Sequence, residues 1–286
     1  MRLDFSSLSF LQKPFRFAQF HQRYTSNIPV LFPKGHFAQL PAISRWFEPA
    51  TFHAEGSATH ASKKFNGAYF GTHGNDIHVD IEVTSQRDGV RQFSRGSSPL
   101  SAFIAHTQNL TSVGSAQQVY IAQSPLTNLS TTLQADVPVM EMLTQSQNYQ
   151  ADVYGSSLWM GLPPTRTPLH RDPNPNLFVQ LAGRKRWRLI SPSIGEQVFA
   201  AASRGSATIR GEDMMVGKEG DYLDDVVWRG GGEGDTAQGF EADLEEGDGI
   251  FVPLGWWHSV RGEGAGINAS VNWWFRFRQP KPNHQS

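Results

Sequence analysis

The sequence predicts a mainly β domain, either a sandwich or a barrel, in the second half of the chain. From about residue 151 to 279, short runs rich in Val, Ile, Trp and Phe are separated by Pro and Gly turns. Closely spaced strands with such turns argue against parallel βαβ units, in which helices separate the strands. The runs are SSLWMGL, NLFVQLAG, RKRWRLI, GIFVPL and ASVNWWFRF.

Helical signals precede these strands, over residues 37–50, 99–110 and 125–149. The stretch from 193 to 246 is long for a plain connection, so we expect it to insert helices and an acidic, glycine-rich loop between the halves of the barrel. We therefore predict one domain over residues 31–286, with its barrel core at about 151–279 and its insertion at about 193–246.

Residues 1–30 are basic and contain no acid apart from Asp4. This composition is consistent both with a targeting segment and with a structured N-terminal arm. We expect an intracellular protein, mitochondrial if the segment is a targeting signal and otherwise cytoplasmic or nuclear.

The amino-acid composition excludes several kinds of site. The chain of 286 residues contains no cysteine, which excludes disulfides, thiolate zinc sites, iron–sulfur clusters and cysteine nucleophiles. Any metal must therefore be bound by His, Asp or Glu. No apolar run approaches the ~18 residues of a membrane span, so we expect no membrane association. A net charge of -1 does not favour an extensive contact with nucleic acid.

The segment Thr167-Pro-Leu-His170-Arg-Asp172 separates a histidine from a carboxylate by one residue. On an extended strand both side chains leave the same face and can share one ion. His258, in GDGIFVPLGWWHSV, supplies a third ligand among aromatic residues. Two imidazoles and one carboxylate form the facial triad of non-haem Fe(II) oxygenases, which leaves positions open for a bidentate co-substrate and dioxygen.

A second His-x-Asp pair, His78-Val79-Asp80, is a decoy. Asp76, His78 and Asp80 alternate with Ile77, Val79 and Ile81, which is the pattern of a strand with one face in solvent. We therefore interpret the pair as part of a solvent-exposed polar face and not as a metal site.

The strand Arg184–Leu189 separates its residues between two faces. Lys185 shares a face with Trp187 and Leu189, which predicts an ammonium group inside an apolar interior. A buried charge needs an anionic partner. The distal carboxylate of 2-oxoglutarate is the natural candidate, and an internal salt bridge to a distant Asp or Glu is the alternative.

Asn176 and Asn272 lie in strongly apolar runs, NLFVQL and SVNWWF, where a buried amide must find hydrogen-bond partners. Both amides could serve structure alone. Strand parity places Asn272 on the same face as Trp274 and not Trp273, so we expect Asn272 and Trp274 to line the pocket.

From about Leu40 to Arg278 the chain resembles the JmjC-domain hydroxylases, a cupin-like family. TPLHRDPNPNLFVQLAGRKRWRLISP resembles the family's first metal-binding block, and EEGDGIFVPLGWWHSV with NASVNWWF resembles the second. YIAQSPL, which begins at Tyr120, resembles the segment that contributes a tyrosine hydroxyl to the co-substrate pocket. The resemblance implies a double-stranded β-helix, the jelly-roll or cupin-like barrel, with N-terminal helices and a helical insertion.

The same resemblance implies roles for named residues. The iron ligands would be His170, Asp172 and His258. Contacts to 2-oxoglutarate would come from Tyr120, Thr167 and Lys185, and the polar supports beside it would be Asn176 and Asn272. Fe(II) would then be the metal, with 2-oxoglutarate and dioxygen as co-substrates.

The implied activity is an Fe(II)- and 2-oxoglutarate-dependent oxygenase that hydroxylates a protein or peptide side chain. Two further reactions fall within this class. One is demethylation of N-methyl-lysine. The other is hydroxylation of a tRNA base, for which a local basic patch would be offered by the outer row Arg184, Arg186 and Arg188 and by the end with Arg276, Arg278 and Lys281. Outside the class are a non-catalytic cupin-like binding module and a zinc hydrolase, since two His and one carboxylate also suit catalytic zinc. The sequence does not predict an oligomeric state.

Overall fold

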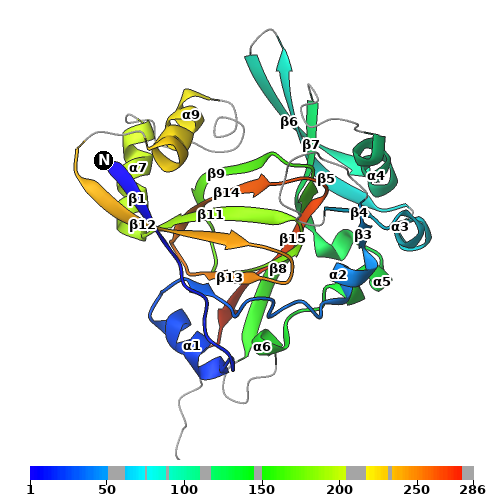
Figure 1. Cartoon of the computed structure of the whole chain (residues 1–286), viewed down its shortest axis with the longest axis horizontal. Coiled ribbons are helices and arrows are strands. Elements are labelled where there is room, and N and C mark those ends of the chain that lie inside the picture. The colour runs from blue at the N-terminus through cyan, green and yellow to red at the C-terminus, as the bar shows by residue number, and fades with distance from the viewer. Residues whose placement is uncertain are drawn as a thin grey trace, which may run out of the picture.

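Eight strands of the computed structural model form two facing antiparallel sheets, whose orders are β13-β10-β15-β8 and β12-β11-β14-β9 (Figure 1). The chain crosses between the two sheets at every step except β11 to β12, which are neighbours in one sheet. This arrangement is the double-stranded β-helix, and the predicted mainly β, cupin-like fold is confirmed. The strands are β8 (Ala151–Gly161), β9 (Thr165–Arg171), β10 (Asn176–Ala182), β11 (Arg184–Ile190), β12 (Thr236–Leu244), β13 (Gly249–Val252), β14 (Trp257–Glu263) and β15 (Asn268–Phe277).

The structure describes residues 1–50, 62–74, 76–87, 90–109, 117–144, 150–203, 217–230 and 234–278. Within these ranges further strands extend both sheets. β1 (Arg2–Ser7) runs parallel to β12. The larger sheet is extended by β2 (Val30–Leu31) at one edge and by β7 (Gln117–Pro125), β5 (His78–Arg87) and β6 (Val90–Pro99) at the other, and β3 (Phe47–Pro49) pairs with β4 (Lys63–Phe65).

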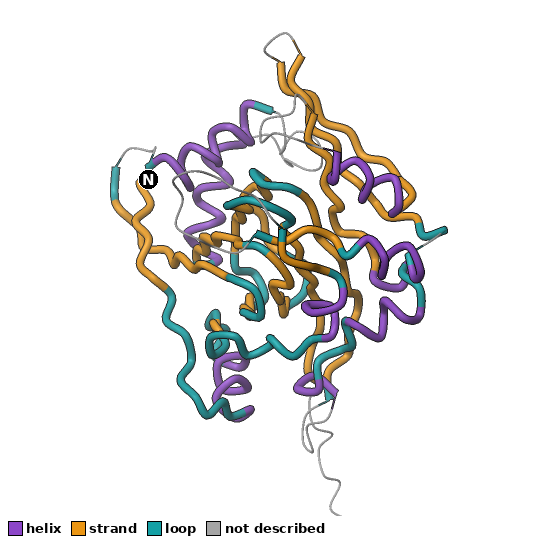
Figure 2. Tube along the Cα trace, turned by 45° about the vertical axis from the view of Figure 1, so that its right-hand side comes forward, coloured by secondary structure: helices purple, strands orange, loops and turns teal. Residues whose placement is uncertain are grey.

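Helices cover the outer faces of both sheets. Figures 1 and 2 show α2 to α5 on one side of the barrel and the helices of the insertion, α7 and α9, on the other. The helices are α1 (Phe17–Thr25), α2 (Pro41–Arg45), α3 (Gly67–His73), α4 (Leu100–Asn109), η1 (Leu126–Asn128), α5 (Thr131–Asp136), α6 (Glu141–Thr144), α7 (Pro192–Ser203), α9 (Lys218–Asp224) and the π-helix η2 (Asp225–Arg229).

Alternation along the strands separates the barrel interior from the outer core. On β10, Leu177 and Val179 pack outward into the large apolar cluster under the N-terminal helices. Phe178, between them, instead joins an interior cluster with Trp187 and Leu189. Because one face of each strand is covered by helices and the other by the opposite sheet, β10 is buried along its whole length.

The outer face of the smaller sheet packs against the insertion. Leu169 and Trp257 from the sheet contact a cluster that includes Val198, Leu223 and Val226. A Cβ atom on Gly195 of α7 would lie 2.0 Å from the Trp257 ring, so only glycine lets this helix approach β14 so closely. The insertion is therefore part of the packed structure and not a detached loop.

The N-terminal arm also packs on the barrel. Its strand β1 lengthens the smaller sheet, and Phe20 of α1 is fully buried against Phe32 and Phe251. No helix in the ranges described above is long and apolar enough to cross a membrane.

The decoy interpretation is confirmed. On β5 and just before it, Ile77 and Val79 are buried, whereas His78 and Asp80 are exposed. These polar side chains belong to a solvent face.

We predict that Asp136→Ala will destabilise the fold. The carboxylate is fully buried and accepts hydrogen bonds from Arg45 Nη1 (2.7 Å), Trp46 Nε1 (2.8 Å) and Tyr69 Oη (2.7 Å), so it joins α2, α3 and α5. Removing one partner of a buried charged network costs about 3 kcal/mol or more. Urea denaturation measures this loss. The control is Glu48→Ala, which removes an exposed pair with Lys64 and should cost less than about 1 kcal/mol.

Candidate metal centre and adjoining pocket

His170, Asp172 and His258 meet at one end of the barrel. Their ligand atoms all lie within 4.8 Å of one another, and in the described part of the chain this is the one group of three such side chains. His170 Nε2 lies 3.8 Å from Asp172 Oδ1, and His258 Nε2 lies 3.7 Å from Asp172 Oδ2. The predicted ligand set is therefore brought together, with a geometry and donor chemistry that fit a divalent metal held on one face.

Both imidazoles are oriented by the backbone. His170 Nδ1 lies 2.9 Å from the Pro168 carbonyl oxygen, and His258 Nδ1 lies 3.3 Å from that of Trp256. If each Nδ1–H donates to its carbonyl, both Nε2 atoms carry free lone pairs towards Asp172. Such outer hydrogen bonds select the tautomer that binds a metal.

A bulge in β9 aims its side chains into the barrel. His258 pairs with His170, but Val260 pairs with Thr167, so Ser259 stands opposite both Pro168 and Leu169. In a regular strand Thr167 and His170, three residues apart, would face opposite sides. The extra residue turns both inward, whereas Leu169 points outward and is buried under the insertion.

Two residues shape the surroundings of the ligands. Asn176 Nδ2 donates to Asp172 Oδ2 over 2.8 Å, which fixes the carboxylate. Trp187 stacks on the His258 ring, with centroids 5.4 Å apart and 22° between the planes. Burial and the neighbouring His170 lower the pKa of His258 to about 4, so the imidazole is neutral at physiological pH, as a ligand must be. His170 is the most accessible ligand, at 30% side-chain exposure.

Lys185 points into the interior, as its strand parity predicts. It is 3% exposed, and its Nζ donates to Ser270 Oγ (2.6 Å) and Tyr120 Oη (3.1 Å). Its cation also lies over the Phe178 ring at 5.1 Å. Burial lowers the pKa of the ammonium to about 7. No Asp or Glu among the described residues forms an ion pair with it, so the internal salt bridge is not found there.

Tyr120 reaches Lys185 from β7, outside the eight-stranded barrel. Its ring lies where a side chain on Gly161 of β8 would be, since a Cβ there would sit 2.6 Å from Tyr120 Cδ2. Burial raises the pKa of its hydroxyl, so the group stays protonated and can donate a hydrogen bond. Tyr120 and Lys185 are thus brought together as predicted.

Asn272 lines the same interior. Its Oδ1 accepts a hydrogen bond from Trp159 Nε1 (2.7 Å), which turns the amide nitrogen away from that ring. Asn272 Nδ2 and Asn176 Oδ1 are buried and have no partner among the residues described. Trp274 is on the same face of β15 as Asn272 and opposite Asn176 in the ladder. Ser270, which accepts a hydrogen bond from Lys185, precedes Asn272 by two residues on the same face of β15. An amide donor and a lysine that both lack an anionic partner among the described residues thus line one interior, which suits a bound carboxylate.

The outer arginine row of the suggested basic patch is paired with acids, and Lys281 of the other part lies outside the described residues. Arg184 and Arg186 both pair with Asp243, and Arg188 pairs with Glu241. These acids come from β12, the neighbouring strand of the same sheet. Arg186 also lies 3.5 Å from Glu263 of β14, so three acids of the neighbouring strands pair with the row. Strand parity within one segment does not reveal such cross-strand pairs.

The sequence analysis missed two residues of the site. Ser270 on β15 contacts Lys185, and Trp159 on β8 contacts Asn272. Parity offered a signal for both, because Ser270 shares a face with Asn272, and Trp159 shares one with the small residues Ser157 and Gly161.

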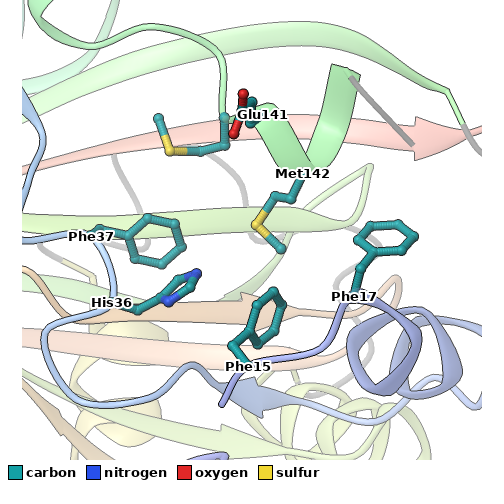
Figure 3. A pocket seen from close by; sticks show the side chains of 7 residues that line it. Phe15, Phe17, His36, Phe37, Glu141 and Met142 are labelled. Atoms are coloured by element: carbon teal, nitrogen blue, oxygen red, sulfur yellow. The ribbon is translucent and has the colours of Figure 1, made fainter. Parts of the chain in front are cut away.

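A separate cavity of about 500 Å³ lies between the N-terminal arm and α6. Figure 3 shows Phe15, His36, Phe37 and Met142 around it. Its lining shares no residue with the candidate metal centre.

The sequence profile of a family described as "Cupin-like domain" matches residues 17–280. This range includes all eight strands of the barrel and every candidate site residue.

The curated relatives are similar over about half of this chain. Lysine-specific demethylase JMJ31 of Arabidopsis thaliana is 29% identical over 145 residues, 50% of this chain and 25% of the relative. Jumonji C domain-containing protein 5 of Drosophila melanogaster is 28% identical over 145 residues, 50% and 34% of the two chains. Lysine-specific demethylase 8 of Danio rerio is 27% identical over 145 residues, 50% and 32%. The matches thus span only a quarter to a third of these relatives, and they confirm the predicted likeness to JmjC proteins.

We predict that Lys185→Met will change how stability depends on pH. The unfolded lysine keeps its proton up to about pH 10.4, whereas the folded one loses it near pH 7. Between these values the unfolded state binds more protons, so wild-type stability gains up to about 1.4 kcal/mol per pH unit from this residue. The variant lacks this gain. Its stability relative to wild type, measured by urea denaturation, should therefore be highest below pH 7 and fall towards pH 10. A pH-independent difference would show that Lys185 is already paired and charged.

Proposed function

The chain belongs to the cupin-like domain family, and we propose that it is an Fe(II)- and 2-oxoglutarate-dependent oxygenase that hydroxylates a side chain of a protein or peptide. The observation that carries this proposal is the combination of the triad with Lys185, a buried cation that has no anionic partner among the described residues. A metal site alone fits many reactions. A metal site beside a buried lysine fits a co-substrate with two acidic ends.

The metal would be held by His170 Nε2, His258 Nε2 and one oxygen of Asp172. When bound, iron would supply the activation of dioxygen and the oxidation of a C–H bond. The protein prepares the ligands for it. Asn176 holds the carboxylate, backbone carbonyls hold the Nδ1 protons, and Trp187 shields His258 from water.

The co-substrate would lie between the metal and Lys185. Its distal carboxylate would accept hydrogen bonds from Lys185 and Tyr120, and Thr167 lies on the inward face of β9 between them and His170. Asn272 Nδ2 offers a further donor to the same ligand. Because burial lowers the pKa of Lys185 to about 7, binding of a dicarboxylate would favour the protonated amine and draw in a proton near neutral pH.

Demethylation of N-methyl-lysine is the second candidate, because two of the three relatives described above are named lysine-specific demethylases. Both reactions begin with oxidation of a C–H bond, and they differ in the carbon that is attacked. A hydroxylated N-methyl group breaks down to formaldehyde, whereas a hydroxylated side-chain carbon remains in the product. Formaldehyde release therefore separates the two.

Three further candidate functions explain fewer of the features of the site. A tRNA substrate loses the support of the outer arginines, because these pair with acids of β12. A zinc hydrolase would use the triad but would leave Lys185 and its Tyr120 and Ser270 neighbours without a role. A non-catalytic binding module would have no need for three intact ligands with oriented Nδ1 atoms.

We predict that anaerobic addition of Fe(II) and 2-oxoglutarate will produce the weak charge-transfer absorption of a chelated metal, and that air will then yield succinate. His170→Ala should lose both signals, because it removes one of the two imidazoles. Absorption spectroscopy and succinate assays measure the two effects. Folded wild-type protein that gave neither signal would exclude the oxygenase.

We predict that Lys185→Ala will retain metal binding and lose affinity for 2-oxoglutarate by at least tenfold, because it removes a charge-assisted partner of a buried carboxylate. The apparent Kd is measured by titrating the charge-transfer band. Wild-type affinity should also fall as the pH rises above 7, where the amine loses its proton. Arg186→Ala, on the outer face of the same strand, is the control and should bind 2-oxoglutarate normally. Normal binding by Lys185→Ala would contradict the assigned inner pocket.

A further inference from the structure

We propose that Ser259 and Trp228 are positioning residues for His170. In this inference, which rests on the proposed metal centre, they hold the bulge of β9 that turns His170 into the barrel. Neither side chain reaches the ligand atoms. Their effect on the metal would pass through the backbone of Thr167 and Pro168.

The candidate metal centre depends on the bulge, because the bulge turns His170 into the barrel. The register between β9 and β14 shifts between the pair His258–His170 and the pair Val260–Thr167. A slip of one residue would send His170 outward and exchange the faces of its neighbours. The bulge also supplies the Pro168 carbonyl, the partner of His170 Nδ1. Ligand direction and tautomer therefore both depend on the same backbone distortion.

Ser259 holds the bulge from the opposite strand. It is 2% exposed, and its Oγ donates to the Thr167 carbonyl oxygen over 2.8 Å. A bulge disrupts the backbone ladder, so a side-chain donor is well placed to satisfy a carbonyl there. Ser259 is also the residue that faces Pro168 and Leu169 across the shifted register.

Trp228 fixes the serine in turn. Its Nε1 donates to Ser259 Oγ over 2.8 Å, which leaves the serine proton free for Thr167. The indole ring contacts two guanidinium groups, Arg188 at 4.7 Å and Arg261 at 4.4 Å from the ring centroid. Arg188 pairs with Glu241 (2.7 Å), and Arg261 makes two 2.9 Å contacts with Asp224. The tryptophan therefore has little freedom to rotate.

The hydrogen bonds from Trp228 to Ser259 and from Ser259 to the Thr167 carbonyl form a relay that links the insertion to the candidate metal centre. Trp228 belongs to η2, a π-helix at the end of the insertion, and π-helices often mark functional positions. Leu169, at the outer side of the bulge, packs into the cluster that contains Val226 and Val227 of the same helix. The insertion thus holds the bulge by one polar and one apolar contact.

Co(II) binding to the full chain tests this proposal, because the absorption bands of Co(II) report both affinity and ligand geometry without turnover. Ser259→Ala removes the hydroxyl. Trp228→Phe keeps an aromatic ring beside the arginines and removes the N–H donor. Loss of such outer contacts commonly weakens metal binding 10- to 100-fold, so we expect at least a tenfold increase in the Kd of both variants and altered Co(II) bands. The double variant should lose no more than Ser259→Ala alone, because both changes break one relay.

Leu133→Ala is the control for stability. This substitution on α5 opens the large apolar cluster under the N-terminal helices, which does not contain Leu169, and should lower Tm without changing the Co(II) Kd. Co(II) affinities and bands in Ser259→Ala and Trp228→Phe that matched wild type would overturn the inference and leave the proposed function standing. Wild-type protein that bound no Co(II) would overturn both.

Discussion

Each barrel strand sends alternate side chains into an interior shared by two sheets, and polar groups buried there need hydrogen-bond partners. Most of it is filled by apolar side chains such as Phe178, Trp187 and Val260. The polar residues gather around two charges, the Asp172 carboxylate and the Lys185 ammonium. Burial of each is tolerable only with hydrogen-bond donors or acceptors in place, and Asn176, Tyr120 and Ser270 provide them.

The two charged groups differ in how far the protein satisfies them. Asp172 receives a hydrogen bond from Asn176 and faces two imidazoles, so a cation is the missing partner. Among the residues that the structure describes, Lys185 has only neutral hydrogen-bond partners, so an anion would complete its pairing. An interior with one carboxylate and one buried amine, both incompletely paired, favours simultaneous binding of a metal and an acid. On the proposed function, burial of Lys185 costs some stability that binding of the ligand would offset.

Alternation along single strands predicted much of this interior from the sequence. It placed Lys185 inward and Asn272 with Trp274, and it separated the exposed His78 and Asp80 from the candidate ligands. It did not predict contacts between strands. The pairing of Arg186 with Asp243, and the meeting of Lys185 with Ser270, depend on registers between segments tens of residues apart. A pattern within one segment carries no information about those registers.

The bulge at Pro168 and Leu169 is where the alternation rule itself fails. Applied strictly, it places Thr167 and His170 on opposite faces, yet both lie on the inward side. Pro168 is compatible with the distortion because it has no N–H to contribute to a ladder, and Leu169 gains burial by turning outward. Local rules are most often broken at functional sites, with compensation elsewhere in the fold. Here the compensating contacts come from Ser259 and from the insertion, so a segment remote from the ligands in sequence helps to decide where His170 points.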